Sequence, residues 1–171
     1  LGFHQAKPVI LMADEISKGT QAVKKALLRI MLERAQGVNV LPEGSIVFAT
    51  GNLALEGVSD MLEAHARNRL CVVKVRKPTA MEWVEQYALN NNIEPVVIGT
   101  VIEFPSMLES FENVEDPSNN QYIHHPKSPR AAFVTPRSLE KASDILKATR
   151  ALPDDVRVHA LCGVIGEPAA M

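Results

Sequence analysis

The sequence predicts an α/β fold in which a partial parallel sheet comes first and a helical part follows. Three observations support this. Residues 8–13 and 45–50 are short apolar runs that are typical of buried strands. Residues 19–35, between them, have apolar side chains at helical spacing. Beyond residue 77 the strong patterns are helical, so we expect an α/β domain over residues 1–77 and a helical domain over residues 78–171.

Composition excludes several classes of protein. The 171 residues are 46% hydrophobic, which is enough for a core, and the net charge of −2 gives no basic field for nucleic acid. The sequence shows neither a signal peptide nor an apolar run of about 18 residues, so we expect a cytoplasmic protein without membrane contact. Cys71 and Cys162 have no metal-ligand spacing and are expected to be buried, reduced thiols.

The first apolar run ends in two adjacent carboxylates, Asp14 and Glu15. A parallel strand that ends in an acidic pair places negative charge at the edge where open α/β sheets bind ligands. Such a pair suits magnesium and phosphate chemistry. Taken alone, the pair is also compatible with the solvated N-terminus of a helix.

The order strand, helix, strand predicts two parallel strands joined by a right-handed crossover. The second strand stops at Gly51 and Asn52, so Asn52 is expected at the same sheet edge as Asp14 and Glu15. Considered alone, an Asn after Gly is more typical of a turn.

The remaining elements follow from local patterns. We expect a short helix over 59–66, a third strand from Leu70 to Val75, and helices over 79–90, 95–103, 138–150 and 153–166. Thr79 and Glu82 have the spacing of a capping box at the start of one helix. Residues 104–133 are predicted to form a long connection with about one helical turn.

Four segments together resemble the motifs of one family. Residues 9–15 are similar to a Walker B strand, and residues 48–52 to the sensor 1 strand. Residues 66–70 resemble the segment with the arginine finger, and residues 132–140 the start of the sensor 2 helix. The chain resembles the AAA+ ATPases over about residues 7–168, specifically the MoxR-like branch and the bacterial and phage ATP-binding proteins near it.

This resemblance implies ATP and Mg²⁺ as cofactors and assigns a role to each matching residue. Asp14 would hold Mg²⁺ mainly through water, and Glu15 would orient and polarise the attacking water. Asn52 would bridge that water to the γ-phosphate. Arg69 would reach into the site of a neighbouring subunit, and Arg137 would contact the phosphate from the helical lid over residues 78–171.

The resemblance further implies a homo-oligomer, with a hexameric ring as the expected state. Its work would be to remodel or activate a partner protein, for which von Willebrand factor A-type proteins are the class in the MoxR branch. None of the nine glycines begins the phosphate-binding loop G-x-x-x-x-G-K-[ST], which precedes Walker B in this family. We therefore expect a piece of a longer protein, with that loop upstream of Leu1, and no ATP hydrolysis by the piece alone.

Two other classes stay open. One is a catalytically degenerate AAA-like module that acts as a binding or scaffold subunit. The other is a metal-dependent phosphohydrolase or nuclease, which needs a further carboxylate at a strand end. The predicted third strand ends instead in basic residues, Lys74, Arg76 and Lys77.

Three smaller features have ordinary structural interpretations. His124 and His125 are adjacent but lack a third ligand at suitable spacing for a metal. Trp83 and Tyr87 are one helical turn apart and are expected to pack together. Arg67, next to the predicted finger, is expected to be a surface charge.

Overall fold

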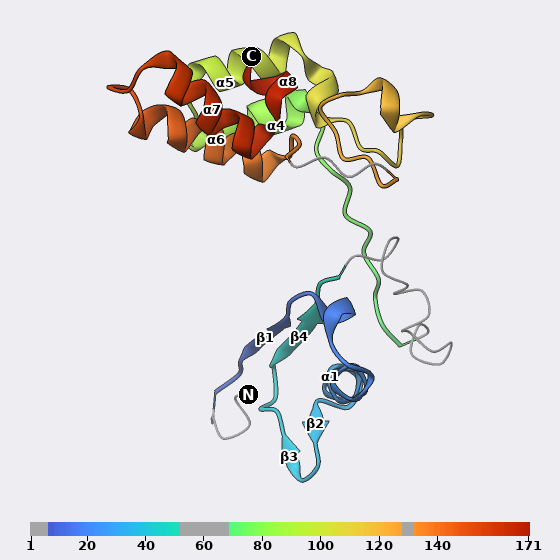
Figure 1. The fold of residues 1–171 in the computed structure, drawn as a ribbon. Coiled ribbons are helices and arrows are strands. Elements are labelled where there is room, and N and C mark those ends of the chain that lie inside the picture. The colour runs from blue at the N-terminus through green and yellow to red at the C-terminus, as the bar shows by residue number, and fades with distance from the viewer. Residues whose placement is uncertain (1–6, 52–68, 128–131) are drawn as a thin grey trace. The chain divides into compact units, whose positions relative to one another are not determined.

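The computed structural model describes residues 7–51, 69–127 and 132–171 (Figure 1). The fold is mixed α/β and divides into two compact units, Leu1–Lys74 and Val75–Met171. Sheets occur in the first unit and helices dominate the second. We describe each unit by itself.

The first unit contains the predicted parallel strand pair. β1 (Ile10–Ala13) pairs with β4 (Ile46–Ala49) so that Ile10 lies opposite Ile46 and Ala13 opposite Ala49. A short 3₁₀ turn, η1 (Ile16–Lys18), and the helix α1 (Gln21–Glu33) connect them. The expected order of strand, helix and parallel strand is therefore confirmed.

Helix α1 has clear signals at both ends. The Thr20 hydroxyl accepts a hydrogen bond from the Val23 amide at 3.4 Å, which caps the N-terminus. The helix ends at Arg34, whose φ of 56° is left-handed. Ile30 is buried, whereas Val23 near the start of the helix is exposed.

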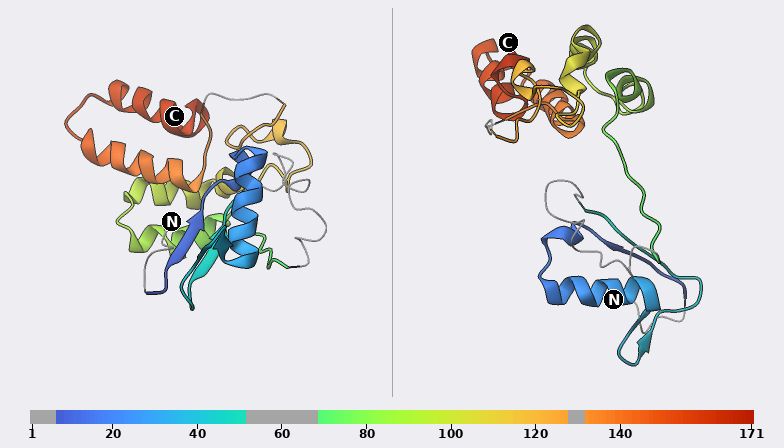
Figure 2. Two further views of the ribbon diagram at one scale, coloured as in Figure 1. Left: turned by 90° about the horizontal axis from the view of Figure 1, so that it is seen from below. Right: turned by 90° about the vertical axis from the view of Figure 1, so that its right-hand side faces the viewer.

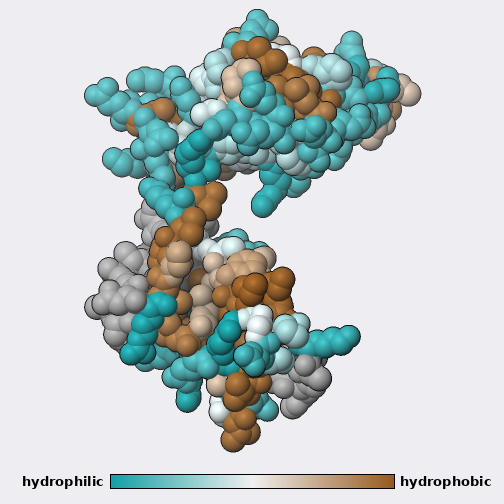
Figure 3. All heavy atoms as spheres, turned by 180° about the vertical axis from the view of Figure 1, so that it is seen from behind, coloured by the Kyte–Doolittle hydropathy of each residue, from teal (hydrophilic) through white to brown (hydrophobic). Residues whose placement is uncertain are grey.

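A small hairpin that the sequence analysis did not predict follows α1. β2 (Ala35–Gln36) and β3 (Asn39–Val40) are antiparallel, and Gly37 turns the chain with a φ of 61°. Val38 at its tip is 97% exposed. The tip appears as a brown, apolar projection at the bottom of Figure 3.

The strands are less buried than predicted. Ile10 and Met12 are 73% and 53% exposed, and their register partners Ile46 and Phe48 are also exposed. These four side chains share one face, because side chains two residues apart on a strand point to the same side. Among the described residues, no element covers this face, although parallel sheets normally bury both faces.

The predicted third strand, Leu70–Val75, is wrong. Residues 71–79 are extended without strand pairing, and Val75 is 86% exposed. A strand needs a hydrogen-bonded neighbour, and the described part of the chain supplies none here, so β-branched residues alone do not make one. Cys71 in this segment is exposed rather than buried, whereas Cys162 is partly buried; both are free thiols, as expected.

The second unit is helical, as the periodicity predicts. α6 and α7 lie side by side, and α8 packs on α7 (Figure 2). In the described part of the connection over 104–133, the regular elements are two short 3₁₀ turns. The elements of the unit are α4 (Ala80–Gln86), η2 (Ala88–Asn90), α5 (Pro95–Glu103), η3 (Pro105–Leu108), η4 (Pro117–Asn119), α6 (Pro136–Ala148), α7 (Asp154–Ile165) and α8 (Glu167–Ala170).

A single apolar core holds these helices together. It includes Trp83 from α4, Val101 from α5, and Leu139 from α6, all at most 2% exposed. The ring centroids of Trp83 and Tyr87 are 6.3 Å apart, which confirms that they pack together. No helix in the described part of the chain is long and apolar enough to cross a membrane.

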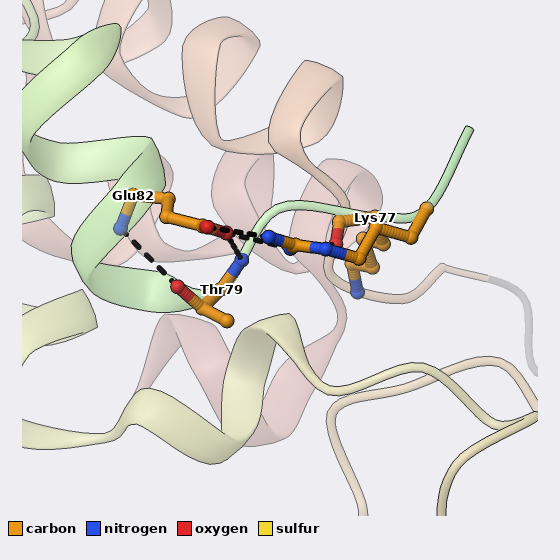
Figure 4. Close-up of polar contacts among 4 residues, drawn as sticks. Lys77, Thr79 and Glu82 are labelled. Carbon is orange, nitrogen blue, oxygen red and sulfur yellow. Dashed lines mark hydrogen bonds and ion pairs between the residues drawn. The ribbon is translucent and has the colours of Figure 1, made fainter.

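The start of α4 is fixed by the predicted capping box (Figure 4). The Glu82 amide donates to the Thr79 hydroxyl at 3.3 Å, and the Thr79 amide donates to Glu82 Oε2 at 2.9 Å. Arg76 adds a forked pair of hydrogen bonds to the same carboxylate. Hydrogen bonds from Arg76 and from the Thr79 amide lower the pKa of Glu82 to about 2.

Candidate acidic site at the end of the parallel strands

Two neighbouring strand ends bring the acidic pair next to Thr50. Asp14 and Glu15 directly follow β1, and Thr50 directly follows β4. The Thr50 amide donates to the Ala13 carbonyl at 2.9 Å, and the Ile16 amide donates to the Thr50 carbonyl at 3.0 Å. These two bonds continue the strand ladder, so the ends of β1 and β4 lie at one edge of the sheet. The predicted place of Asn52 at this edge stays a prediction.

The Thr50 side chain organises the acidic pair. Its hydroxyl donates to Asp14 Oδ1 and accepts a hydrogen bond from the Glu15 amide at 3.2 Å. One hydroxyl thus orients the Asp14 carboxylate and the Glu15 backbone together. Thr50 has a weak signal in the sequence, namely its position at the end of an apolar strand and before Gly51.

Glu15 has an unusual backbone conformation. Its φ of 50° and ψ of 46° are left-handed, which costs a non-glycine residue on the order of 1 kcal/mol. The Glu15 carboxylate lies 2.8 Å from Lys18 Nζ, and both side chains are more than half exposed. An exposed ion pair of this kind contributes little energy, so the Glu15 carboxylate stays accessible to water.

Asp14 fits a magnesium site of one particular kind. Mg²⁺ usually keeps several waters and takes one or two protein carboxylates together with phosphate oxygens. Asp14 is exposed and has one oxygen held by Thr50, which suits such a site. Within the described ranges there is no group of three or more His, Cys, Asp or Glu residues that could hold a metal by protein ligands alone.

The roles of the other predicted site residues stay predictions. Asn52 and Arg67 lie outside the described residues. Arg69 lies in an exposed turn before the extended segment. Arg137 is exposed in the first turn of α6, in the helical unit, so its meeting with Asp14 stays a prediction.

The basic residues after the predicted third strand have structural contacts. Arg76 binds Glu82, and Lys77 Nζ donates to the Glu109 carbonyl at 2.9 Å. These contacts fix the start of the helical unit.

The two adjacent histidines are likewise engaged with protein groups. His124 lies between two phenylalanine rings, and His125 Nε2 is 3.0 Å from the Ser118 hydroxyl.

No protein-family model, curated protein or solved structure matches this chain.

Proposed function

We propose that this chain is the water-activating and sensing part of a MoxR-like AAA+ ATPase. The observation that supports this most is the pair of parallel strands whose adjacent ends hold Asp14, Glu15 and the orienting Thr50. ATP hydrolysis needs a cation held near the phosphates and a carboxylate that accepts a proton from water. Asp14 and Glu15 offer a carboxylate for each of these two roles.

Each residue has a distinct role in the proposal. Asp14, oriented by Thr50, would hold Mg²⁺, which would neutralise phosphate charge when bound. Glu15 would orient the attacking water and accept its proton. Asn52 would position the same water, while Arg69 and Arg137 would add positive charge at the transferring phosphate.

Hydrolysis also needs a phosphate-binding loop, and the 171 residues contain none. The proposed activity therefore belongs to a longer polypeptide that contains this chain, and the chain alone should not hydrolyse ATP. In that polypeptide the proposed state is a homo-oligomeric ring, because an arginine that acts in the site of a neighbouring subunit requires that neighbour. The proposed ring acts on a partner protein.

Mixing two inactive variants of the longer polypeptide tests the roles of Glu15 and Arg69. Glu15→Gln removes the proton acceptor in its own site, and Arg69→Ala removes the finger supplied to the next site. Each should abolish turnover alone. In an equal mixture, about a quarter of the interfaces combine an intact Glu15 with an intact Arg69 from the neighbour, and activity should return to about that level.

The matched control is Glu43→Gln, which changes an exposed glutamate in the turn before β4. It should keep full turnover, alone or mixed with wild type. Absence of any recovery in the Glu15→Gln and Arg69→Ala mixture would rule out a finger that acts in the neighbouring site. Normal turnover by Glu15→Gln alone would overturn the proposed function.

One observation favours the scaffold alternative. The Glu15 carboxylate already has an ion-pair partner in Lys18, with which an attacking water would share it. In a scaffold subunit, Lys18→Ala would leave ATP turnover absent, whereas in an ATPase it should leave turnover intact or raise it.

A further inference from the structure

A second candidate site lies in the helical unit, apart from the acidic pair. A cavity of about 360 Å³ opens between the long connection and the start of α6. Its volume falls in the range of small-molecule sites. Its lining is mostly apolar and includes Phe111, Ile123, His124, Phe133, Val134 and Pro136.

Three flat side chains form one wall of this cavity. The His124 ring centroid lies 5.3 Å from that of Phe111, edge to face, and 5.1 Å from that of Phe133. These separations are those of favourable aromatic pairs. A wall built from edge-on and tilted rings favours an aromatic group, which can pack edge-to-face against them, over a flexible chain.

Lys77 also lines the cavity and supplies a positive charge. Its Nζ donates one hydrogen bond to the Glu109 carbonyl at 2.9 Å, which uses one of the three donors of an ammonium. Partial burial lowers the pKa of Lys77 to about 8, against the opposing attraction of the Glu109 carboxylate. The ammonium is thus charged at neutral pH but poorly hydrated, which strengthens its attraction for an anion.

Glu109 is the acidic residue of the lining and must be considered as a competitor for Lys77. Glu109 Oε2 accepts a hydrogen bond at 2.8 Å from Nδ2 of Asn120, which is 9% exposed. This bond engages one carboxylate oxygen of Glu109 with a neutral amide. Glu109 therefore lowers the positive potential at Lys77 without forming a direct ion pair with it.

We infer that this cavity binds a planar aromatic ring that carries a carboxylate. The ring lies against Phe111, His124 and Phe133, and the carboxylate accepts hydrogen bonds from Lys77 Nζ. Two sources share this chemistry: a free aromatic acid, and the C-terminal aromatic residue of a peptide. The site does not depend on the proposed ATPase activity, since it lies wholly in the helical unit.

Isothermal titration calorimetry on the 171-residue chain tests the inference with three probes. They are 3-phenylpropionate, its neutral amide, and a tripeptide that ends in phenylalanine with a free carboxylate. The acid should bind at least about tenfold more tightly than the amide. Binding of the tripeptide as tight as that of the acid assigns the site to chain termini, and much weaker binding assigns it to free acids.

Variants separate the ring wall from the charge. Lys77→Met keeps the apolar stem and should reduce binding of the acid to the level of the amide. Phe133→Leu should weaken binding of the acid and of the amide alike. The matched control, Lys141→Met, changes an exposed lysine on α6 and should leave binding unchanged. Fluorescence of Trp83, the sole tryptophan, reports whether each variant is folded.

The pH dependence of the wild type gives a test that needs no variant. Because the ammonium loses its proton near pH 8, affinity for the acid should fall about tenfold between pH 7 and pH 9. In Lys77→Met, Glu109 and His124 still face the cavity, so the same pH series on that variant isolates the part due to the ammonium. Equal binding of acid and amide, an affinity that does not change with pH, or no heat from any probe would overturn the inference.

Discussion

Replacing Thr50 with valine should loosen the end of the parallel strand pair. Valine has the shape and strand preference of threonine but loses the hydroxyl that donates to Asp14 and accepts from the Glu15 amide. A hydrogen bond to a charged group contributes about 1.5–3 kcal/mol when it is buried. Asp14, Glu15 and Thr50 are all exposed, so water can replace these hydrogen bonds in the variant and the cost of losing them is smaller. We expect the two bonds together to contribute about 1 kcal/mol to the free energy of opening this end of the strand pair.

Amide hydrogen exchange measures the free energy of local opening at the ends of β1 and β4. A loss of about 1 kcal/mol corresponds to about fivefold faster exchange for the Thr50 and Ile16 amides, which continue the ladder between the strand ends. Trp83 lies in the helical unit, so the urea unfolding curve followed by its fluorescence serves as an internal control. The midpoint of this curve should be the same in Thr50→Val and in the wild type. Unchanged exchange at both amides would refute the reasoning that Thr50 holds this edge together.

Two further predictions concern the helical unit. Ser143 on α6 is fully buried, and its hydroxyl accepts a hydrogen bond at 2.9 Å from the amide of Glu94, the residue before α5. Ser143→Ala leaves this amide without its partner and should therefore lower the free energy of unfolding by about 1–3 kcal/mol, as measured by urea unfolding followed at Trp83. An unchanged unfolding midpoint would show that this hydrogen bond contributes nothing to stability. Glu82 has its pKa lowered to about 2 by Arg76 and the Thr79 amide, so its contribution is present above the ordinary value of 4.5 and is lost as the pH falls toward 2. Thermal unfolding of Glu82→Gln should thus depend less on pH between 4.5 and 2 than that of the wild type, and parallel pH curves would contradict this.

Elements with complete local signals were predictable from the sequence. The Thr79 hydroxyl accepts a hydrogen bond from the Glu82 amide three residues later, which fixes the start of α4. The strand pair β1 and β4 was predictable because a helix between two apolar runs leads to parallel pairing, which the register confirms. These features depend on residues close together in the chain or on one common topology.

Features that depend on a distant partner were not predictable. The segment Leu70–Val75 has the composition of a strand, but composition does not supply a neighbouring strand edge. The role of Thr50 depends on a contact with Asp14 across 36 residues.

The hairpin over Ala35–Val40 is local, but its strands are two residues long, which is too short for periodicity to predict them.

The most direct test of the proposed function is phosphate release by Glu15→Gln in the longer polypeptide, measured beside binding of a fluorescent ATP analogue. The amide has the shape of the carboxylate but cannot accept the proton of the attacking water. The proposal predicts nucleotide binding within about twofold of wild type and phosphate release reduced by at least about a hundredfold. Phosphate release at the wild-type rate, or loss of nucleotide binding, would contradict the role assigned to the acidic pair.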